Sequence, residues 1–269
     1  MAFKVDIIQD SVSPAGKRIT TLTATYPRFV HAEVMTHRDR ARNAASSRAI
    51  PWRKMRDAVI TEPVVPIKWG MEQKGMQTGD ELPPDLCDQA VSIWKAARSD
   101  AVKWADALAA LGVHKSLVNR LIEPFAWITV VMTATEWNNF FRLRCHQDAE
   151  IHFQKIACMM RDALAASKPV ERVWHLPFVQ EDELGHHPSI LAKVSTARCA
   201  RVSFLTHDGK RDINADFDRF DKLCQGSGFG HWSPHEHPAQ ADVDPNKRSG
   251  PFVGWNQYRK SFENENVAG

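Results

Sequence analysis

The sequence predicts an α+β fold, a modest antiparallel sheet carrying a helical layer, from three features of the 269-residue chain. First, residues 3–30 are mostly extended, and Ile19–Thr25 shows the β-branched alternation of a half-buried strand. Second, apolar residues recur at helical spacing from Pro84, and Gly112 is placed to terminate that helix. Third, 43% of the residues are apolar, enough for a sizeable core. We therefore expect a single domain spanning residues 1–269.

The remaining elements follow in chain order. The dipeptide Tyr26-Pro27 ends the first strand, and a helix is expected from near Phe29. Residues 61–84 are rich in Pro, Gly and Lys and predict a long loop, which in a compact domain is often functional. We also expect further helix over about 115–135 and 136–165, with breaks near Pro124 and around Thr133–Glu136. A connector is expected over 166–195, followed by a short helix over 191–203 and a helix over Asp216–Leu223. An alternating strand is expected over Phe252–Ser261.

Charge and cysteine content argue against several classes of protein. The net charge of +3 is too small for a surface that coats nucleic acid. No apolar run is long enough to span a membrane, and charges appear too early for a signal peptide. The five cysteines are scattered without a C-x-x-C pair, which fits a cytoplasmic, reducing location and no disulfide framework.

An arginine-rich segment, His37–Arg48, combines four arginines with Asn43, Ser46 and Ser47. Guanidinium forks match phosphate oxygens, and Ser and Asn add neutral donors. Backbone N–H groups of the small-residue turn Ala44–Ser47 can line an anion site. Together these features suggest phosphate binding, although composition alone favours a solvated, charged helix face.

Two further arginines lie in apolar sequence contexts, Arg120 in LVNRLIEPF and Arg144 in NNFFRLRC. A buried arginine needs a partner. That partner is either a structural carboxylate, such as Glu123 or Glu136, or a phosphate or carbonyl group of a ligand. Without further information the structural alternative is favoured for each.

A histidine-rich segment, His231–His237, holds three histidines and Glu236, which are groups that ligate zinc. The spacing H-x-x-x-H-x-H is not a regular helical pair, because Pro234 breaks the turn, and no cysteine pair supports it. We expect no metal site, and a zinc protein stays an alternative that metal analysis tests.

The segment His37–Arg48 resembles the signature R-H-R-x-x-S-x-N-x-x-S-x-R of the flavin-dependent thymidylate synthases. Thr36 stands where the family has its first Arg, and Ala41 stands where it has its first Ser. The positions that match are His37, Arg38, Asn43, Ser46 and Arg48.

A second resemblance runs from Arg120 to Glu150. The family has an Arg before an apolar-Pro turn, then Y-T, N-F-L-x-L-R and a short acidic segment. Between Thr129 and Asn139 this chain is shorter than the family, and one flavin-contacting Asn has no counterpart. The corresponding residues here are Arg120, Pro124, Trp127–Thr129, Asn139–Arg144 and Asp148–Ile151.

A third resemblance involves two segments in an altered order. Arg198–Phe204 resembles the family's R-A-A-R-V-S-F, and Gly230–His237 resembles its G-H-E-T-P-F-E-H. In the family both precede the Arg-His-Arg signature, whereas here they follow it. The resemblance therefore implies a circularly permuted ThyX-like fold, a rearrangement that termini lying close together make tolerable.

The resemblance implies a specific reaction. The family transfers the methylene group of methylenetetrahydrofolate to C5 of dUMP, giving dTMP, and FAD reduced by NADPH supplies the hydride. The family forms homotetramers whose active sites are built from several subunits, and it does not use an active-site cysteine nucleophile. Small-molecule nucleotide and folate are then the partners of this chain, with no membrane and no nucleic acid.

The resemblance also implies roles for individual residues. Arg144 would meet the pyrimidine edge, where a cation favours charge delocalised into the ring and activates C5. Ser203 would lie near the adenosine part of FAD, and His231 at the entrance for flavin and folate. The nucleotide site would comprise Glu33, Ser46, Ser47, Arg48, Arg120 and Arg144, and the FAD site Thr36, His37, Arg38, Asn139, Ser203, His231, Ser233 and Glu236.

Departures from the family pattern leave alternatives open. Glu33 replaces a family Gln in the nucleotide site, Ala44 replaces a Glu, and Thr36 removes a positive charge near the flavin. A carboxylate could accept a hydrogen bond from a cytosine amino group, so dCMP is an alternative substrate and a hydroxymethyl group an alternative product. A nucleic-acid-binding module that uses the arginines and tryptophans is a further alternative.

Two expectations concern positions in space. The Arg48 and Arg120 guanidinium groups should converge on one anion, in one chain or across subunits, because forked donors grip a phosphate from two sides. The chain just after His237 should lie beside residues 17–20 if the order of segments is permuted. Residues 166–195 would then join the family's old C-terminus to its old N-terminus, and Phe252–Ser261 would add a strand to the sheet.

Overall fold

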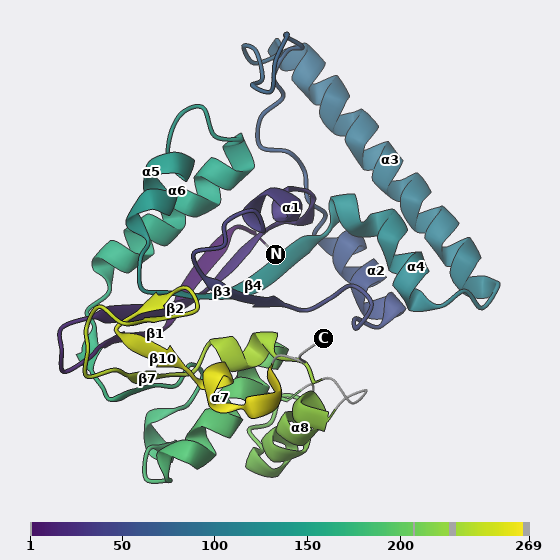
Figure 1. Ribbon diagram of the computed structural model, residues 1–269. Helices are drawn as coiled ribbons and strands as arrows, with labels where there is room; N and C mark the ends of the chain where they lie inside the picture. The colour runs from purple at the N-terminus through teal and green to yellow at the C-terminus, as the bar shows by residue number, and fades with distance from the viewer. Residues whose placement is uncertain (1, 207, 226–229, 266–269) are drawn as a thin grey trace.

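A five-stranded sheet forms the centre of the computed structural model, which describes residues 2–206, 208–225 and 230–265 (Figure 1). Neighbouring strands are antiparallel except at one edge, where the fifth strand runs parallel to the first. The α+β class is confirmed, and the sheet is mixed rather than purely antiparallel. In spatial order the strands are β3 (Ala41–Ala44), β4 (Trp127–Ala134), β2 (Arg18–Pro27), β1 (Lys4–Val12) and β5 (Val170–Glu171).

Strand β2 is the predicted strand, and it is buried on both faces. Leu22, Ala24 and Tyr26 face the main apolar cluster, which also contains Phe153. On the threonine face, Thr25 hydrogen-bonds the Thr129 hydroxyl of β4 across the ladder at 2.8 Å. Cross-strand threonine pairs of this kind stabilise a sheet and satisfy hydroxyl groups that would otherwise be buried alone.

The helix expected over residues 115–135 is wrong in its second half. A short helix and a 3-10 turn end at Phe125, and the chain then enters β4, between β3 and β2. Val130, Val131 and Thr133 are β-branched and stiff at χ1, which favours a strand. Because β4 is covered on both faces, it lacks the alternation that would have identified it. The elements here are α4 (Lys115–Val118) and η2 (Asn119–Phe125).

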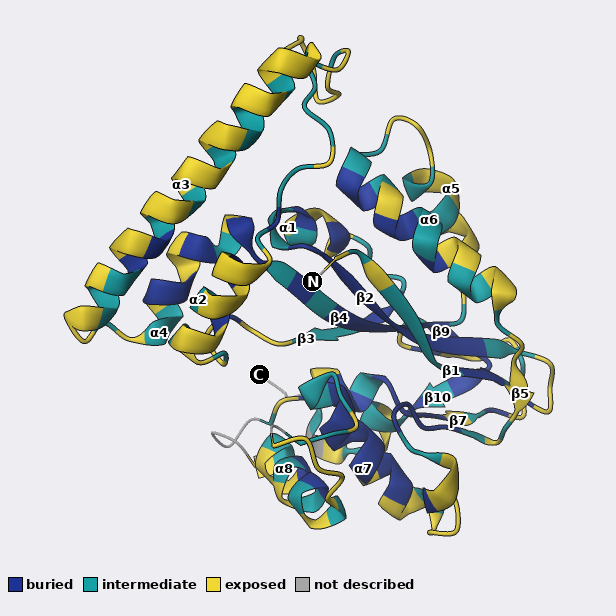
Figure 2. Cartoon of the chain, turned by 180° about the vertical axis from the view of Figure 1, so that it is seen from behind, coloured by how far each residue is buried: buried dark blue, intermediate teal, exposed yellow. Residues whose placement is uncertain are grey.

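The helical layer of the N-terminal two thirds has two parts. One packs on the sheet through Phe140, Phe153 and Ile156, and the other forms a second cluster around Val102 and Ile122. The long helix from Pro84 extends away from the sheet and is exposed along most of its length (Figures 1 and 2). The helices are α1 (His31–Val34), preceded by η1 (Arg28–Val30), α2 (Trp52–Thr61), α3 (Pro84–Ala110), α5 (Asn138–Arg144) and α6 (Ile151–Ala166).

Two sequence expectations hold in this layer. Helix α3 ends as predicted, and Gly112 just beyond it has a φ of +79°, a left-handed conformation that favours glycine at a helix end. The segment between α2 and α3 is a loop with one isolated bridge, Gly70 to Glu81. Among the described residues, no helix combines the length and the apolar character needed to cross a membrane.

The last third of the chain covers the other face of the sheet with helices and small sheets. Two expected helices are present with other bounds. The first begins earlier, at Pro188, which shortens the connector before it, and ends at Arg201, whereas the second extends past 216–223 at both ends. The elements are β6 (Trp174–His175), η3 (Glu181–Glu183), α7 (Pro188–Arg201), α8 (Ile213–Gln225), η5 (Ser233–Glu236), β7 (Ala239–Ala241), β8 (Arg248–Ser249), β9 (Phe252–Val253), β10 (Trp255–Gln257), η6 (Tyr258–Ser261) and η7 (Glu263–Glu265).

The expectation of one added strand over Phe252–Ser261 on the main sheet is wrong. The segment breaks at Gly254, whose φ is +72°, and a Cβ there would lie 2.6 Å from Lys17 Cγ. This close approach needs glycine and divides the segment in two. Strand β9 pairs with β8, and β10 joins a separate three-stranded sheet of order β10-β7-β6.

The chain after His237 lies beside the start of β2, as expected. Ala239 and Trp255 pack on Ile19 in one apolar cluster, and the Trp255 indole N–H donates to the Lys17 carbonyl at 3.0 Å. The position in space is therefore confirmed. The rearranged order of segments relative to the family stays a prediction.

A buried polar chain ties this layer to the sheet. His175 contacts Ser11 at 2.9 Å and Thr21 at 2.7 Å, Thr21 contacts Thr133 at 2.6 Å, and Thr133 contacts His237 Nδ1 at 2.8 Å. Ser11, Thr21, Thr133 and both histidines are fully buried. Burial lowers the pKa of each histidine to about 3, so both imidazoles are neutral in the folded protein.

The two buried histidines predict a loss of stability in mild acid. A histidine in the unfolded chain titrates near pH 6.5. Between that pH and about 3, His175 and His237 therefore bind protons in the unfolded chain but not in the folded protein. The free energy of unfolding should fall by about 1.4 kcal/mol per pH unit for each histidine over this window. Urea unfolding at pH 7 and pH 5 measures the loss, with the exposed His114→Gln variant as control. Equal stability at both pH values would contradict the prediction.

Candidate active site

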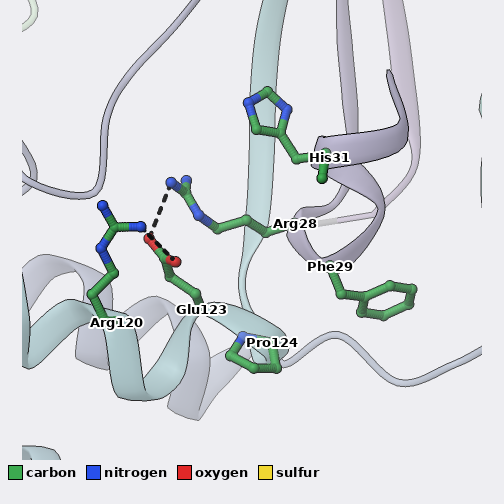
Figure 3. A pocket seen from close by; sticks show the side chains of 7 residues that line it. Arg28, Phe29, His31, Arg120, Glu123 and Pro124 are labelled. Carbon is green, nitrogen blue, oxygen red and sulfur yellow. Dashed lines mark hydrogen bonds and ion pairs between the residues drawn. The ribbon is translucent and has the colours of Figure 1, made fainter. Parts of the chain in front are cut away.

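Two pockets meet at the start of α1. The first, of about 370 Å³, is lined by residues of η1, α1 and η2 (Figure 3). The second, of about 360 Å³, lies between α1, β3, β4 and Ser233 of η5. Arg28 and His31 line both pockets, so the two are adjacent. The first pocket is lined by Arg28, Phe29, His31, Ala32, Arg120, Glu123 and Pro124, and the second by Arg28, His31, Met35, Arg42, Asn43, Ala44, Ala45, Ser46, Ile128, Val130 and Ser233.

The first pocket holds a carboxylate between two guanidinium groups. Arg28 Nη2 lies 3.2 Å from Glu123 Oε1, and Arg120 Nη1 lies 3.4 Å from Glu123 Oε2 (Figure 3). The Arg28 side chain is 12% exposed, whereas that of Arg120 is 58% exposed. Arg120 is thus reachable by a ligand, and its apolar sequence context does not bury it.

His31 presents a neutral ring to both pockets. Burial, followed by the Arg28 and Arg42 cations, lowers its pKa. Its Nδ1 lies 2.9 Å from the hydroxyl of Tyr26, which is buried and whose pKa burial raises. The protonated Tyr26 hydroxyl can donate to Nδ1, and Nε2 then carries the hydrogen. The imidazole would in that tautomer offer an N–H donor to the pockets.

The second pocket brings two distant segments of the sequence together. Asn43 of β3 donates from Nδ2 to the Cys199 carbonyl at 2.9 Å, and its Oδ1 accepts from Ser233 Oγ at 3.3 Å. Arg42 donates to the carbonyls of Met35 and His37 and fixes the turn between α1 and β3. The arginine-rich segment therefore contains a strand, and it contacts the segment that holds Ser233.

A third group of predicted residues lies near α5 and α6. Arg144 Nε lies 2.7 Å from His37 Nε2, and its guanidinium stacks 4.9 Å from the centre of the Phe153 ring. Burial and then the Arg40 and Arg144 cations lower the pKa of His37, so the neutral ring accepts the Arg144 hydrogen bond. Burial, followed by the Glu150 carboxylate, raises the pKa of Glu33.

The family model described as "Thymidylate synthase complementing protein" matches residues 12–170, more than half of the chain. The chain belongs to this family. It is therefore an enzyme of that family, and the first two resemblances described above, around His37–Arg48 and Arg120–Glu150, lie inside the matched range. The third, over 198–237, lies outside it. No curated protein sequence matches the chain.

The chain is similar in structure to a nucleotide methylase. The crystal structure of a UMP/dUMP methylase PolB from Streptomyces cacaoi bound with 5-Br UMP superposes with a TM-score of 0.51 and 16% sequence identity, over 61% of this chain and 88% of that chain. The same enzyme bound with 5-Br dUMP gives a TM-score of 0.49 at 16% identity, over 61% and 90% of the two chains. The first of these shows that the fold is shared.

Within one chain, the residues that the family resemblance assigns to one site fall into separate groups. Ser46 and Arg120 line the adjacent pockets, whereas Glu33 and Arg144 lie on the α5–α6 side with His37. Arg48 is exposed and does not line the Arg120 pocket. The expected convergence of Arg48 and Arg120 is therefore not seen within one chain, and across subunits it stays a prediction.

The other assigned residues are placed as follows. The Ser47 carbonyl accepts from Asn119 Nδ2 at 2.7 Å, while Arg38 is exposed. Ser203 lines a pocket on the sheet beside Thr25, and His231 lines one beside α8. In the remaining contacts, Thr36 Oγ1 donates to the Glu33 carbonyl at 2.7 Å, Asn139 Oδ1 accepts from Arg142 at 3.2 Å, and Glu236 pairs with Arg259 at 2.5 Å.

The histidine-rich segment forms no metal centre among the described residues, where no group of three or more His, Cys, Asp or Glu side chains is arranged to hold an ion. His235 and His237 are both buried and have different partners. His235 Nε2 lies 3.5 Å from Cys224 Sγ, and His237 contacts Thr133. Ser233, two residues before His235, lines the second pocket.

Sequence reasoning did not single out three residues that line these pockets, Arg28, His31 and Arg42. Arg28 was identifiable as the first residue after the strand-ending Pro27, since side chains at strand ends often line sites. Arg42 sits at a position that the family signature leaves open. Its importance depends on the turn that it braces, which the pattern does not reveal.

Proposed function

We propose that this enzyme catalyses the flavin-dependent transfer and reduction of a one-carbon unit from methylenetetrahydrofolate to C5 of dUMP, giving dTMP. The observation that carries the proposal is family membership, with matching motif residues around two adjacent pockets. The UMP/dUMP methylase with the same fold acts on the same class of pyrimidine nucleotide. Product analysis with dUMP, dCMP and UMP offered separately tests the proposal, and dTMP from dUMP is the expected result.

The nucleotide would be held through its phosphate and its base. Arg48 and Arg120 would bind the phosphate with Ser46 and Ser47 beside them, because forked and neutral donors together satisfy several phosphate oxygens. Arg144 would act at the pyrimidine, with its side chain oriented by His37 at 2.7 Å and by the Phe153 ring. Electrostatic stabilisation of the activated ring is the main contribution expected of it.

The second pocket is suited to part of a flavin. A space of about 360 Å³ with polar groups of Asn43, Ser46 and Ser233 along its wall can receive a ring system but not a whole dinucleotide. FAD reduced by NADPH supplies the hydride chemistry, while the protein binds and orients. We assign Thr36, His37, Arg38, Asn139, Ser203, His231, Ser233 and Glu236 to its binding, as the family resemblance implies.

The grouping of these residues supports a site shared between subunits. Glu33 and Arg144 would belong to one subunit of a homotetramer, and Ser46, Arg48 and Arg120 to its neighbour, so that the two groups complete one nucleotide site. Cys199 and Ser233 both hydrogen-bond Asn43 of β3 in their own chain, which supports one catalytic domain with a permuted order of family segments.

Glu33 motivates the alternative activity, a hydroxymethylase acting on dUMP or dCMP on the same scaffold. Because the pKa of its carboxyl is raised, Glu33 is protonated at a pH closer to neutral, and the protonated carboxyl group resembles the amide of the family's Gln. In either form its oxygens can accept a hydrogen bond from a cytosine amino group, if Glu33 reaches the base. A hydroxymethylated product in the same analysis would favour this alternative.

A further inference from the structure

The first pocket holds a charge arrangement that the family motifs do not account for. Arg28 reaches it from η1 and Arg120 from η2, and both meet the carboxylate of Glu123 (Figure 3). A carboxylate between two guanidinium forks occupies the place that a phosphate oxygen would take. The Glu123 carboxylate is thus an anion that the protein itself places in the pocket.

The carboxylate is held loosely. Charge-assisted N–H···O bonds usually measure about 2.7–2.9 Å, whereas the two contacts here are 3.2 Å and 3.4 Å. Glu123 Oε1 is buried, yet among the described residues it receives no well-directed hydrogen bond, although Arg28 lies at ion-pair distance. Glu123 Oε2 accepts one long hydrogen bond from Arg120 Nη1 at 3.4 Å, and a carboxylate held by one long hydrogen bond and one ion-pair contact is easily displaced by a better acceptor.

The remaining lining favours an anion of higher charge. Two arginines and one glutamate leave a net positive charge, and the neutral His31 can add an N–H donor. A phosphate monoester carries nearly two negative charges at neutral pH and three acceptor oxygens. It can therefore engage both arginines more strongly than the single carboxylate does.

Resting on the proposed function, we propose that Arg28 is a further phosphate-binding residue of the nucleotide site and that Glu123 is a built-in competitor for that phosphate. Glu123 keeps Arg28 and Arg120 directed into the pocket. When a nucleotide monophosphate binds, its phosphate replaces the carboxylate as their counter-ion. Glu123 lowers affinity for every anion, and the most highly charged ligand overcomes it best.

Isothermal titration calorimetry of the 269-residue protein with dUMP, deoxyuridine and inorganic phosphate tests the proposal. Glu123→Gln should bind dUMP and phosphate about tenfold more tightly, because one repelling charge is removed at close range. Arg28→Met should bind both about tenfold more weakly. Deoxyuridine, which lacks the phosphate, should bind all variants alike. Glu136→Gln, at an exposed carboxylate paired with Arg248, is the matched control.

In Glu123→Gln, Arg28 loses its carboxylate partner, and a double variant controls for any loss of folding that results. Arg28→Met with Glu123→Gln carries neither charge and should bind dUMP more tightly than Arg28→Met alone. If wild type binds dUMP, then unchanged or weaker dUMP binding by Glu123→Gln, or a double variant no tighter than Arg28→Met, overturns the inference and leaves the proposed function standing. Tighter phosphate binding by Glu123→Gln without any dUMP binding supports the inference and counts against the proposed function. No phosphate or dUMP binding by wild type or Glu123→Gln overturns the inference.

Discussion

Replacing Arg144 with alanine is expected to lower kcat about 30- to 1000-fold without unfolding the protein. The guanidinium would act at the pyrimidine, and losing one charge-assisted contact in a site that excludes water removes roughly 2–4 kcal/mol of transition-state stabilisation. The fold should persist, because Arg144 lies at the end of α5 and its contacts are to His37 and to the face of Phe153. Steady-state kinetics and thermal melting of Arg144→Ala measure both effects.

Two companion variants separate charge from geometry. Arg144→Lys keeps a positive charge but loses the planar fork, so it should recover only part of the activity. Arg161→Ala removes an exposed arginine of α6 that pairs with Asp162 and should leave turnover unchanged. Wild-type turnover in Arg144→Ala would refute the role assigned to this residue.

Replacing Arg198 with methionine is expected to destabilise the fold by about 3–5 kcal/mol, because breaking a buried ion pair leaves uncompensated charge. Arg198 is fully buried and donates to Glu183 at 2.6 and 2.7 Å, to Asp216 at 2.9 Å and to the Phe178 carbonyl at 3.0 Å. These contacts join α7 to η3 and α8, the layer that carries Ser233 to the second pocket. Chemical unfolding of the variant measures the loss.

The matched control for Arg198 lies in the same charge cluster. Arg211 pairs with Asp182 at the surface, where solvent screens the interaction, so Arg211→Met should unfold close to wild type. Stability of Arg198→Met equal to that of wild type would show that the buried cluster is not what holds this layer together.

The sequence predicted local features better than the arrangement of buried strands. Strand β2 and helix α3 were predicted because alternation and helical spacing survive in their sequences. Strand β4 was taken for helix because a central strand is apolar on both faces and short apolar runs fit either period. The division of 252–261 at Gly254 follows from the approach of Lys17, a contact between distant parts of the chain that local pattern does not contain.

In the candidate site, too, local motifs were predicted and contacts between distant residues were not. The motif residues Asn43, Ser46 and Ser233 were predicted, and the structure places them around one pocket. The pairing of Arg28 with Glu123 was not predicted, because it joins two short 3-10 turns across long sequence separation. The separation of Arg144 from Arg120 could not be read from the sequence either, since motifs record residue types and not positions in space.

The central claim is tested most directly by mass analysis of the product formed from dUMP with FAD, NADPH and methylenetetrahydrofolate. The account predicts dTMP when all components are present, no product when FAD or NADPH is omitted, and transfer of label from isotopically labelled methylene carbon to the pyrimidine. Unmodified dUMP in the complete mixture, with FAD bound to folded protein, or dTMP formed equally well without FAD, would contradict it.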